Sequence, residues 1–154
     1  MNPYEQKLKQ YLSAYAIRAE HLSFTQSCHS VAEAAAVVGA SPTDFVKSIC
    51  LIDVRGNLIV AIVKGEDRVS TAAVGNVLGV ERPRIASPDE MLERTGYPCG
   101  GTPPFGYAAT FLIDSRVMEN AVVYAGGGSE QSLVKVAPAE LQRANNGRVV
   151  SIRK

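Results

Sequence analysis

Hydrophobic residues recur at helical spacing near the start of the chain. Between residues 3 and 19 they lie three and four positions apart, with charged residues between them, which predicts a first helix. Five later segments carry helix start signals, either a capping serine or a proline in the first turn. These signals predict helices that begin at Ser30, Ser41, Ser70, Ser87 and Pro138. Glycines end four of these helices, at Gly39, Gly79, Gly96 and Gly147.

Two nearly continuous apolar runs predict strands at residues 49–54 and 58–63. The segment Arg55-Gly56-Asn57 lies between them and is typical of a hairpin turn. Because both faces of these runs are apolar, we expect these strands to be covered on both sides. Shorter apolar segments predict later strands at residues 108–113, 121–124, 133–136 and 149–152.

The order of these elements indicates the fold class. Helices and strands are mixed without the regular alternation that builds a parallel sheet, which favours an α+β fold with a mainly antiparallel, barrel-like mixed sheet flanked by helices. A dinucleotide-binding fold is disfavoured, because no Gly-x-Gly-x-x-Gly follows a strand. The chain has 154 residues and no internal repeat or linker, so we expect a single domain over residues 1–154, with the helix at about 3–19 packed on it.

Composition is ordinary for a globular protein, with 46% hydrophobic and 20% charged residues. No run approaches the roughly 20 apolar residues that cross a bilayer, and the first ten residues do not resemble a secretion signal, so we expect a cytoplasmic protein without membrane contact. Three scattered cysteines argue against a disulfide framework. With His21 and His29 as the only histidines, we expect neither a metal site nor a cofactor.

The net charge of the chain is +1, whereas most proteins that coat duplex DNA have a large positive net charge. A protein that contacts only the end of an RNA needs no more than a local basic patch. Basic residues do gather near both chain ends, although a solvated surface is the simpler interpretation. They are Lys7, Lys9, Arg18, Arg143, Arg148, Arg153 and Lys154.

The segment from Gly96 to Gly106 has four glycines and three prolines in eleven residues. Glycine lets a ligand approach the backbone closely, and proline fixes the backbone and removes an N–H donor. The remaining N–H groups of such a rigid loop can converge on an anion or on a developing oxyanion. The alternative is a purely structural connection between a helix and a strand.

Three other features are candidates for a site. Lys47 stands at the start of an otherwise apolar strand, where a lysine either reaches solvent or points into a cleft. The segment 126–129, Gly-Gly-Gly-Ser, follows an apolar strand and forms either a wall close to a ligand or a loose surface turn. Asp114 ends a predicted strand, and we expect its role to be structural.

No protein nucleophile stands out from the sequence. Cys99 lies in the glycine-rich loop, but Cys28 is adjacent to His29 and few histidines are available to activate a thiol. No Gly-x-Ser-x-Gly elbow indicates a serine hydrolase. An enzyme built from this chain must therefore act by positioning and electrostatics.

Six motifs follow one another in a fixed order along the chain. They are Ser30-Val31-Ala32-Glu33-Ala34-Ala35, Phe45-Val46-Lys47-Ser48, Gly65-Glu66-Asp67-Arg68-Val69, Thr95-Gly96-Tyr97, Gly100-Gly101-Thr102-Pro103-Pro104-Phe105-Gly106 and Ile113-Asp114. Over about residues 20–150 the chain thereby resembles the YbaK/ProX family of aminoacyl-tRNA deacylases, free-standing relatives of the editing domain of bacterial prolyl-tRNA synthetases.

The resemblance implies hydrolysis, in trans, of the ester that joins a wrong amino acid to the 3′ end of a tRNA. It implies catalytic roles for Lys47, Gly100 and Gly101. Many relatives carry a serine just before the late glycine segment, where this chain has Tyr124-Ala125. The implied substrate-binding residues are Thr102, Pro104, Phe105, Gly126, Gly127 and Ser129.

The implied chemistry needs no protein base, since an aminoacyl ester is already activated and the neighbouring ribose hydroxyl is thought to help activate the water. Loop N–H groups would stabilise the oxyanion, and Lys47 would hold the terminal phosphate or ribose. The partners implied are mischarged tRNA and, as a second candidate, an aminoacyl-tRNA synthetase, with no DNA. Two alternatives stay open: a non-catalytic module that binds tRNA or a synthetase, and a hydrolase for another small ester or amide.

Overall fold

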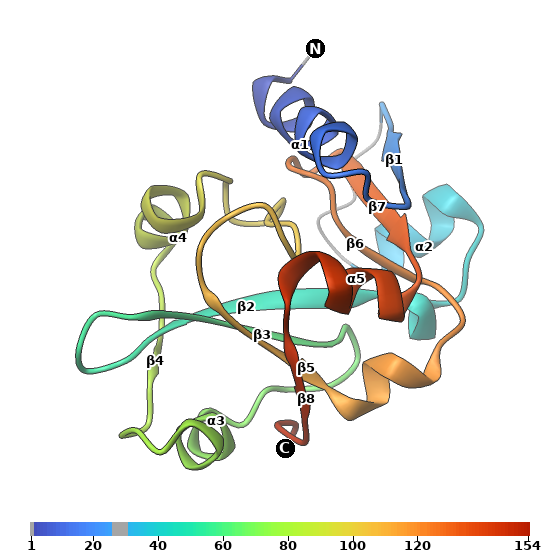
Figure 1. Cartoon of the computed structure of the whole chain (residues 1–154). Coiled ribbons are helices and arrows are strands. Elements are labelled where there is room, and N and C mark those ends of the chain that lie inside the picture. The colour runs from blue at the N-terminus through green and yellow to red at the C-terminus, as the bar shows by residue number, and fades with distance from the viewer. Residues whose placement is uncertain (1, 26–30) are drawn as a thin grey trace.

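The computed structural model describes residues 2–25 and 31–154, and Figure 1 shows the arrangement of its helices and strands. The predicted helix start at Ser30, together with Cys28 and His29, lies outside the described residues. Helices are α1 (Pro3–Ala14), α2 (Val31–Val38), α3 (Thr71–Leu78), α4 (Pro88–Thr95) and α5 (Pro138–Asn145), with 3-10 turns η1 (Pro42–Asp44) and η2 (Ser115–Glu119). Strands are β1 (Ala19–Ser23), β2 (Val46–Ile52), β3 (Leu58–Lys64), β4 (Arg84–Ile85), β5 (Thr110–Asp114), β6 (Val123–Gly126), β7 (Ser132–Val136) and β8 (Arg148–Val150).

Within these described ranges the strands form two sheets, with orders β4-β2-β3-β5-β8 and β1-β7-β6. The β2–β3, β2–β4, β1–β7 and β6–β7 pairs are antiparallel, whereas β3–β5 and β5–β8 are parallel. A backbone bridge from Phe45 to Tyr124 joins the start of β2 to β6 and so links the two sheets. The predicted α+β fold with a barrel-like mixed sheet is therefore confirmed, although the barrel is not closed.

β3 is the centre of the larger sheet, and all seven of its residues are buried. Its alternate side chains enter two apolar clusters on opposite faces of the sheet. Val60 and Ile62 pack in the cluster that also holds Leu8 of α1, whereas Ala61 and Val63 pack against Val74 of α3. Coverage on both faces explains the nearly continuous apolar run in the sequence.

The capping signals locate the middle helices correctly. The Ser70 hydroxyl accepts from the Ala73 N–H at the start of α3. Ser87 and Glu90 form the complete capping box of α4. Gly79 and Gly96, at φ +67° and +81°, end these helices in the left-handed conformation that favours glycine.

Several predicted boundaries are wrong, and β1 and β4 are strands that the sequence did not indicate. The first helix ends at Ala14 rather than at Ala19, because Ala16 turns to φ +50° and the chain enters β1, which pairs with β7. The spacing of apolar residues continues past this turn and does not reveal it. β2 begins at Val46, three residues earlier than predicted. At the end of α5, Asn146 rather than Gly147 takes the left-handed conformation, with φ +54°.

None of the helices in the described ranges is long and apolar enough to cross a membrane.

Candidate active-site cleft

A cleft of about 260 Å³ opens along one edge of β2, where the two sheets diverge. At one end of this edge Phe45 bridges to Tyr124, and at the other end Leu51 and Ile52 pair with β4. The part of the edge between these pairings, residues 47–49, lines the cleft. The remaining walls come from α2, α4, the glycine-rich loop and β6.

One wall of the cleft is aromatic. The rings of Phe45 and Tyr124 stack with centroids 5.0 Å apart and an interplanar angle of 24°. Ala34 of α2 and Leu133 of β7 pack with both rings. This wall is mostly buried and can contact an apolar group of a ligand.

The opposite wall begins with a tight turn at residues 98–101. The Gly101 N–H donates to the Pro98 carbonyl oxygen at 3.1 Å, and Gly100 has φ +90°, a geometry typical of a type II turn with glycine at its third position. The Thr102 hydroxyl donates to the same Pro98 oxygen at 3.1 Å. The Gly100 N–H has no hydrogen-bond partner among residues 2–25 and 31–154, and Gly100 lines the cleft.

The glycine-rich loop packs backbone to backbone against the late glycine segment. The Gly128 N–H donates to the Gly101 carbonyl at 2.8 Å. A Cβ on Gly101 would lie 2.5 Å from the Ser129 nitrogen, and one on Gly126 would collide with the Thr102 carbonyl. The two segments therefore need glycine for close approach, which holds the Gly100 turn rigidly beside β6.

Lys47 lies at the edge of the cleft, half-buried, on the face of β2 opposite to Ser48. Burial lowers the pKa of its ammonium group, and the positive charge of Arg68 lowers it further, while Asp67 acts in the opposite direction. Lys47 is the cation among the described residues that line the cleft, and its charge suits a phosphate or a developing negative charge.

Of the nine residues carried over from the resemblance, the structure brings four together as cleft lining: Lys47, Gly100, Thr102 and Gly126. Gly101 lies directly behind them. The other four do not line the cleft, and each has a clear structural contact. Phe105 is fully buried against Tyr11, and the Pro104 carbonyl accepts from Asn145. The Gly127 carbonyl is 2.8 Å from His21 Nε2, and the buried Ser129 hydroxyl donates to Glu5.

Several lining residues were not predicted from the sequence. Phe45 and Ser48 lie within two residues of Lys47 in the chain, and this proximity is the signal that could have found them. Cys99 belongs to the glycine-rich loop that the sequence had singled out, whereas Met91 of α4 reaches the cleft through tertiary packing, for which a single sequence offers no signal.

The structural role predicted for Asp114 agrees with its contacts. Its side chain is fully buried and accepts from the Ile152 N–H, the Arg153 guanidinium and the Arg116 N–H. Burial alone would raise the pKa of this carboxyl, but these hydrogen bonds and the Arg153 charge outweigh it and lower the pKa. Asp114 thus joins the C-terminal segment to β5, away from the cleft.

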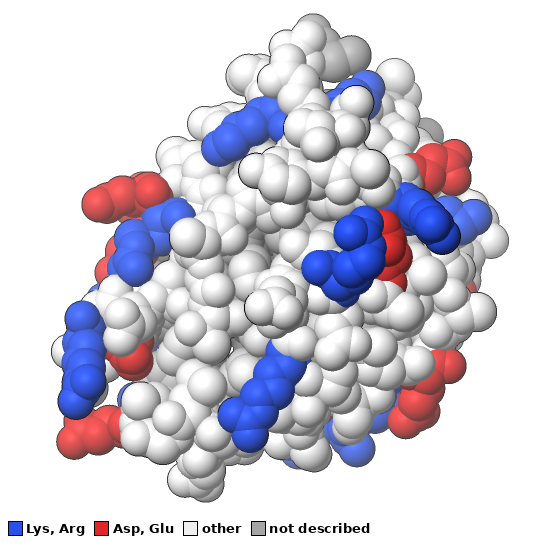
Figure 2. Space-filling model, viewed as in Figure 1, with Lys and Arg blue, Asp and Glu red and all other residues white. Residues whose placement is uncertain are grey.

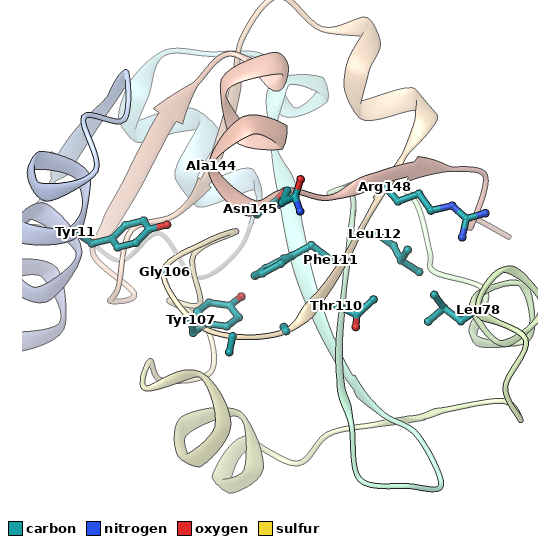
Figure 3. Close-up of a pocket in the computed structure, with 13 residues that line it drawn as sticks. Tyr11, Leu78, Gly106, Tyr107, Thr110, Phe111, Leu112, Ala144, Asn145 and Arg148 are labelled. Carbon is teal, nitrogen blue, oxygen red and sulfur yellow. The ribbon is translucent and has the colours of Figure 1, made fainter.

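A second hollow, of about 560 Å³, lies between α1, α5 and the segment before β5 (Figure 3). Tyr11 and Tyr107 border it in the close-up, and Arg148 lies at its far side. Arg148 is the one charged side chain among the described residues that line this hollow. None of the nine carried-over residues lines it, so the cleft at β2 is the stronger candidate for an active site.

Charged side chains are spread over the face seen in Figure 2, several of them with the opposite charge beside them. Some basic residues near the chain ends have structural contacts: Arg143 pairs with Glu140 at 2.6 Å, and Lys7 lies 4.6 Å from the centroid of the Tyr97 ring. The face in Figure 2 therefore carries no broad basic surface.

Comparisons with known proteins identify the family of this chain. A family model described as the aminoacyl-tRNA editing domain matches residues 25–144. The uncharacterized protein YwhH of Bacillus subtilis (strain 168) is 27% identical over 128 residues, which are 82% of this chain and 81% of that protein. A proline–tRNA ligase of Bacillus licheniformis is 30% identical over 108 residues, 70% of this chain. That match spans 19% of the ligase.

A solved structure proposed to be a trans-editing enzyme for prolyl tRNA synthetase has the same fold. Its TM-score is 0.92 at 25% sequence identity, and the superposition covers 100% of this chain and 99% of the other. The whole architecture, including α1, therefore has a counterpart in a protein of nearly the same extent.

Proposed function

Because this chain belongs to the family of aminoacyl-tRNA editing domains, we propose that it hydrolyses the ester bond of mischarged aminoacyl-tRNA in trans. The observation that supports this proposal is the meeting, in one cleft, of the half-buried Lys47, an aromatic wall and the Gly100 N–H, which has no partner in the part of the chain that the structure describes. Together they offer a cation, an oxyanion donor and an apolar surface, the groups that an aminoacyl ester needs.

The reaction is addition of water to the ester carbonyl followed by loss of the ribose oxygen. Negative charge develops on the carbonyl oxygen, and the Gly100 N–H donates to it. Gly101 is less suited as a donor, since its N–H is already bonded to Pro98. Its role in the proposal is to hold the Gly100 turn against the late glycine segment. The departing ribose oxygen takes up the proton released by the attacking water, so the step balances without a protein nucleophile.

Lys47 contributes charge rather than proton transfer. Its ammonium, with Arg68 nearby, binds the terminal phosphate or ribose of the tRNA and so fixes the ester beside Gly100. The stacked Phe45 and Tyr124 rings contact the amino-acid side chain. A cleft of this size favours an amino acid with a small side chain. Small amino acids are those that a synthetase pocket excludes poorly, so a second site that hydrolyses their esters would restore accuracy.

The broader setting of the reaction is also proposed. Residues 1–154 act as one editing domain, with α1 as an integral part of it. Mischarged tRNA is the substrate, an aminoacyl-tRNA synthetase is a candidate partner, and the cytoplasm is the expected location. No cofactor or metal is needed for the steps described.

The test is hydrolysis of a panel of mischarged tRNAs by the wild type and by Lys47→Ala. We expect cleavage of one or two esters with small side chains, and a loss of kcat/KM on the order of 100-fold in the variant, as for removal of one preorganised electrostatic contact. Lys9→Ala, which changes an α1 lysine remote from the cleft, is the matched control and should retain full activity.

Two results would contradict the proposal. Full activity of Lys47→Ala would remove Lys47 from the site. A wild type that binds tRNA and cleaves none of the esters would indicate a binding module instead. In that case affinity should fall steeply with salt if the contacts are to phosphates.

A further inference from the structure

Ser48 has an unusual position in the cleft. Its Oγ is almost fully shielded from water and has no hydrogen-bond partner within residues 2–25 and 31–154. A buried hydroxyl without a partner destabilises the fold, and native structures keep few of them. Ser48 lines the cleft beside the Gly100 turn, so a bound ligand could provide the missing partner.

The backbone of Ser48 also faces the cleft. Along β2, the odd-numbered residues form the backbone hydrogen bonds to β3. Two flanking bonds fix this pattern: the Gly65 N–H donates to the Phe45 carbonyl, and the Asp53 N–H donates to the Asn57 carbonyl. Even-numbered residues point their amide groups to the other edge, where the Cys50 carbonyl accepts from Ala86. The Ser48 carbonyl falls on this edge, between the pairing with β4 and the bridge to β6.

Ser48 therefore offers two acceptors at this edge, its carbonyl oxygen and Oγ. The hydroxyls of Thr102 and Ser132 also line the cleft but are already hydrogen-bonded, to Pro98 and Ser129, whereas Lys47 and the Gly100 N–H are donors. An aminoacyl ester carries one group that needs acceptors, its α-amino group. Rotation about χ1 moves the Ser48 hydroxyl between staggered positions, one of which can turn Oγ toward this group beside the backbone carbonyl.

We propose that Ser48 binds the α-amino group of the substrate, through its carbonyl oxygen and Oγ, and thereby selects α-amino acid esters over esters that lack the amine. This inference rests on the proposed function. It assigns Ser48 as a specificity residue that acts on the amino-acid half of the substrate, whereas Lys47 acts on the tRNA half.

The test uses two stable adenosine derivatives, 3′-deoxy-3′-(L-alanylamino)adenosine and its des-amino propionyl counterpart, and measures their binding by calorimetry. The wild type should bind the amine-bearing compound more tightly. Ser48→Ala should reduce this preference about tenfold, the loss typical of one hydrogen bond to a charged group. Ser48→Thr retains the hydroxyl and should retain the preference. The exposed Ser151→Ala is the matched control and should behave as the wild type.

A stability measurement separates binding from a structural role. Removal of an unpartnered hydroxyl should leave the melting temperature of Ser48→Ala equal to that of the wild type or higher. A melting temperature several degrees lower would show that the hydroxyl supports the fold, and would overturn the inference.

Other outcomes are equally decisive. An unchanged preference in Ser48→Ala, or a wild type that binds both compounds equally or neither, would overturn the inference. Binding does not require turnover, so the two proposals can fail separately. If no mischarged tRNA is cleaved but the amine preference depends on Ser48, the hydrolytic function fails and the binding role stands.

Discussion

Glycine at residue 101 is required by its neighbours rather than by its own backbone angles. Its φ is not in the left-handed region, yet an added Cβ would meet the backbone of residues 128 and 129 at 2.6 Å and 2.5 Å. Gly79 is the reverse case, with φ +67° and open space around it. Glycine is therefore needed at residue 101 because of close packing, and at residue 79 because of the backbone conformation.

Gly101→Ala should lower the free energy of unfolding by about 1–3 kcal/mol, because backbone atoms that cannot rotate away must shift. It should also lower deacylation, since the Gly100 turn moves with its neighbour. Denaturant titration and kcat/KM check both effects. Gly79→Ala, the control, should cost about 1 kcal/mol through backbone strain and leave kcat/KM unchanged. Wild-type activity in Gly101→Ala would show that the loop tolerates displacement.

At the scale of elements, α1 supports the site from behind. Glu5, on its buried face, accepts from the Ser129 hydroxyl at 2.8 Å and from the Ser23 hydroxyl at 2.6 Å. Ser129 in turn is hydrogen-bonded to Ser132 at 2.8 Å. One carboxylate thus joins α1, β1 and the turn that follows the late glycine segment.

Glu5→Ala should reduce the free energy of unfolding by about 1–3 kcal/mol, because the buried Ser129 hydroxyl loses an acceptor, whereas the exposed Ser23 hydroxyl can bond to water instead. Glu5→Gln retains one acceptor oxygen and should cost less. We expect both variants to reduce kcat more than KM, since they loosen the glycine wall without contacting the substrate. Chemical denaturation and steady-state kinetics provide the measurements. Equal stability of Glu5→Ala and the wild type would contradict this prediction and would mean that water takes the place of the carboxylate as hydrogen-bond acceptor.

At the scale of the whole molecule, Asp114 fastens the C-terminal segment to the larger sheet. Since its pKa is lowered in the folded state, its carboxylate stabilises the fold above the unfolded pKa of about 3.9. That contribution is lost as pH falls from about 5 through the folded value. Protonation removes the charge that pairs with Arg153 at 2.9 Å.

Asp114→Asn should therefore lower stability at pH 7 by about 3 kcal/mol, the scale of a broken buried ion pair, and flatten the loss of stability between about pH 5 and pH 2. Thermal unfolding across this range is the measurement. Glu93→Gln, which changes an exposed carboxylate, is the control and should follow the wild-type profile. A variant that keeps the full acid dependence would place the responsible carboxylate elsewhere.

Local signals along the chain determine much of this fold. The starts and ends of α3 and α4 follow from Ser70, Ser87 and the glycines after each helix, because capping depends on residues within one turn. The β2–β3 hairpin follows from two apolar runs and a turn between them. The family resemblance likewise depends on the order of short motifs along the chain.

Tertiary structure alone decided how these elements form a cleft. The sequence does not indicate that α1 stops at Ala14, that β5 pairs in parallel with β3, or that Phe105 enters the core rather than the cleft. These features depend on contacts between residues far apart in the chain, and a local sequence pattern does not reveal the energies of such contacts. The unpaired edge at Ser48 is of the same kind, since it exists only where β4 and β6 both fail to cover β2.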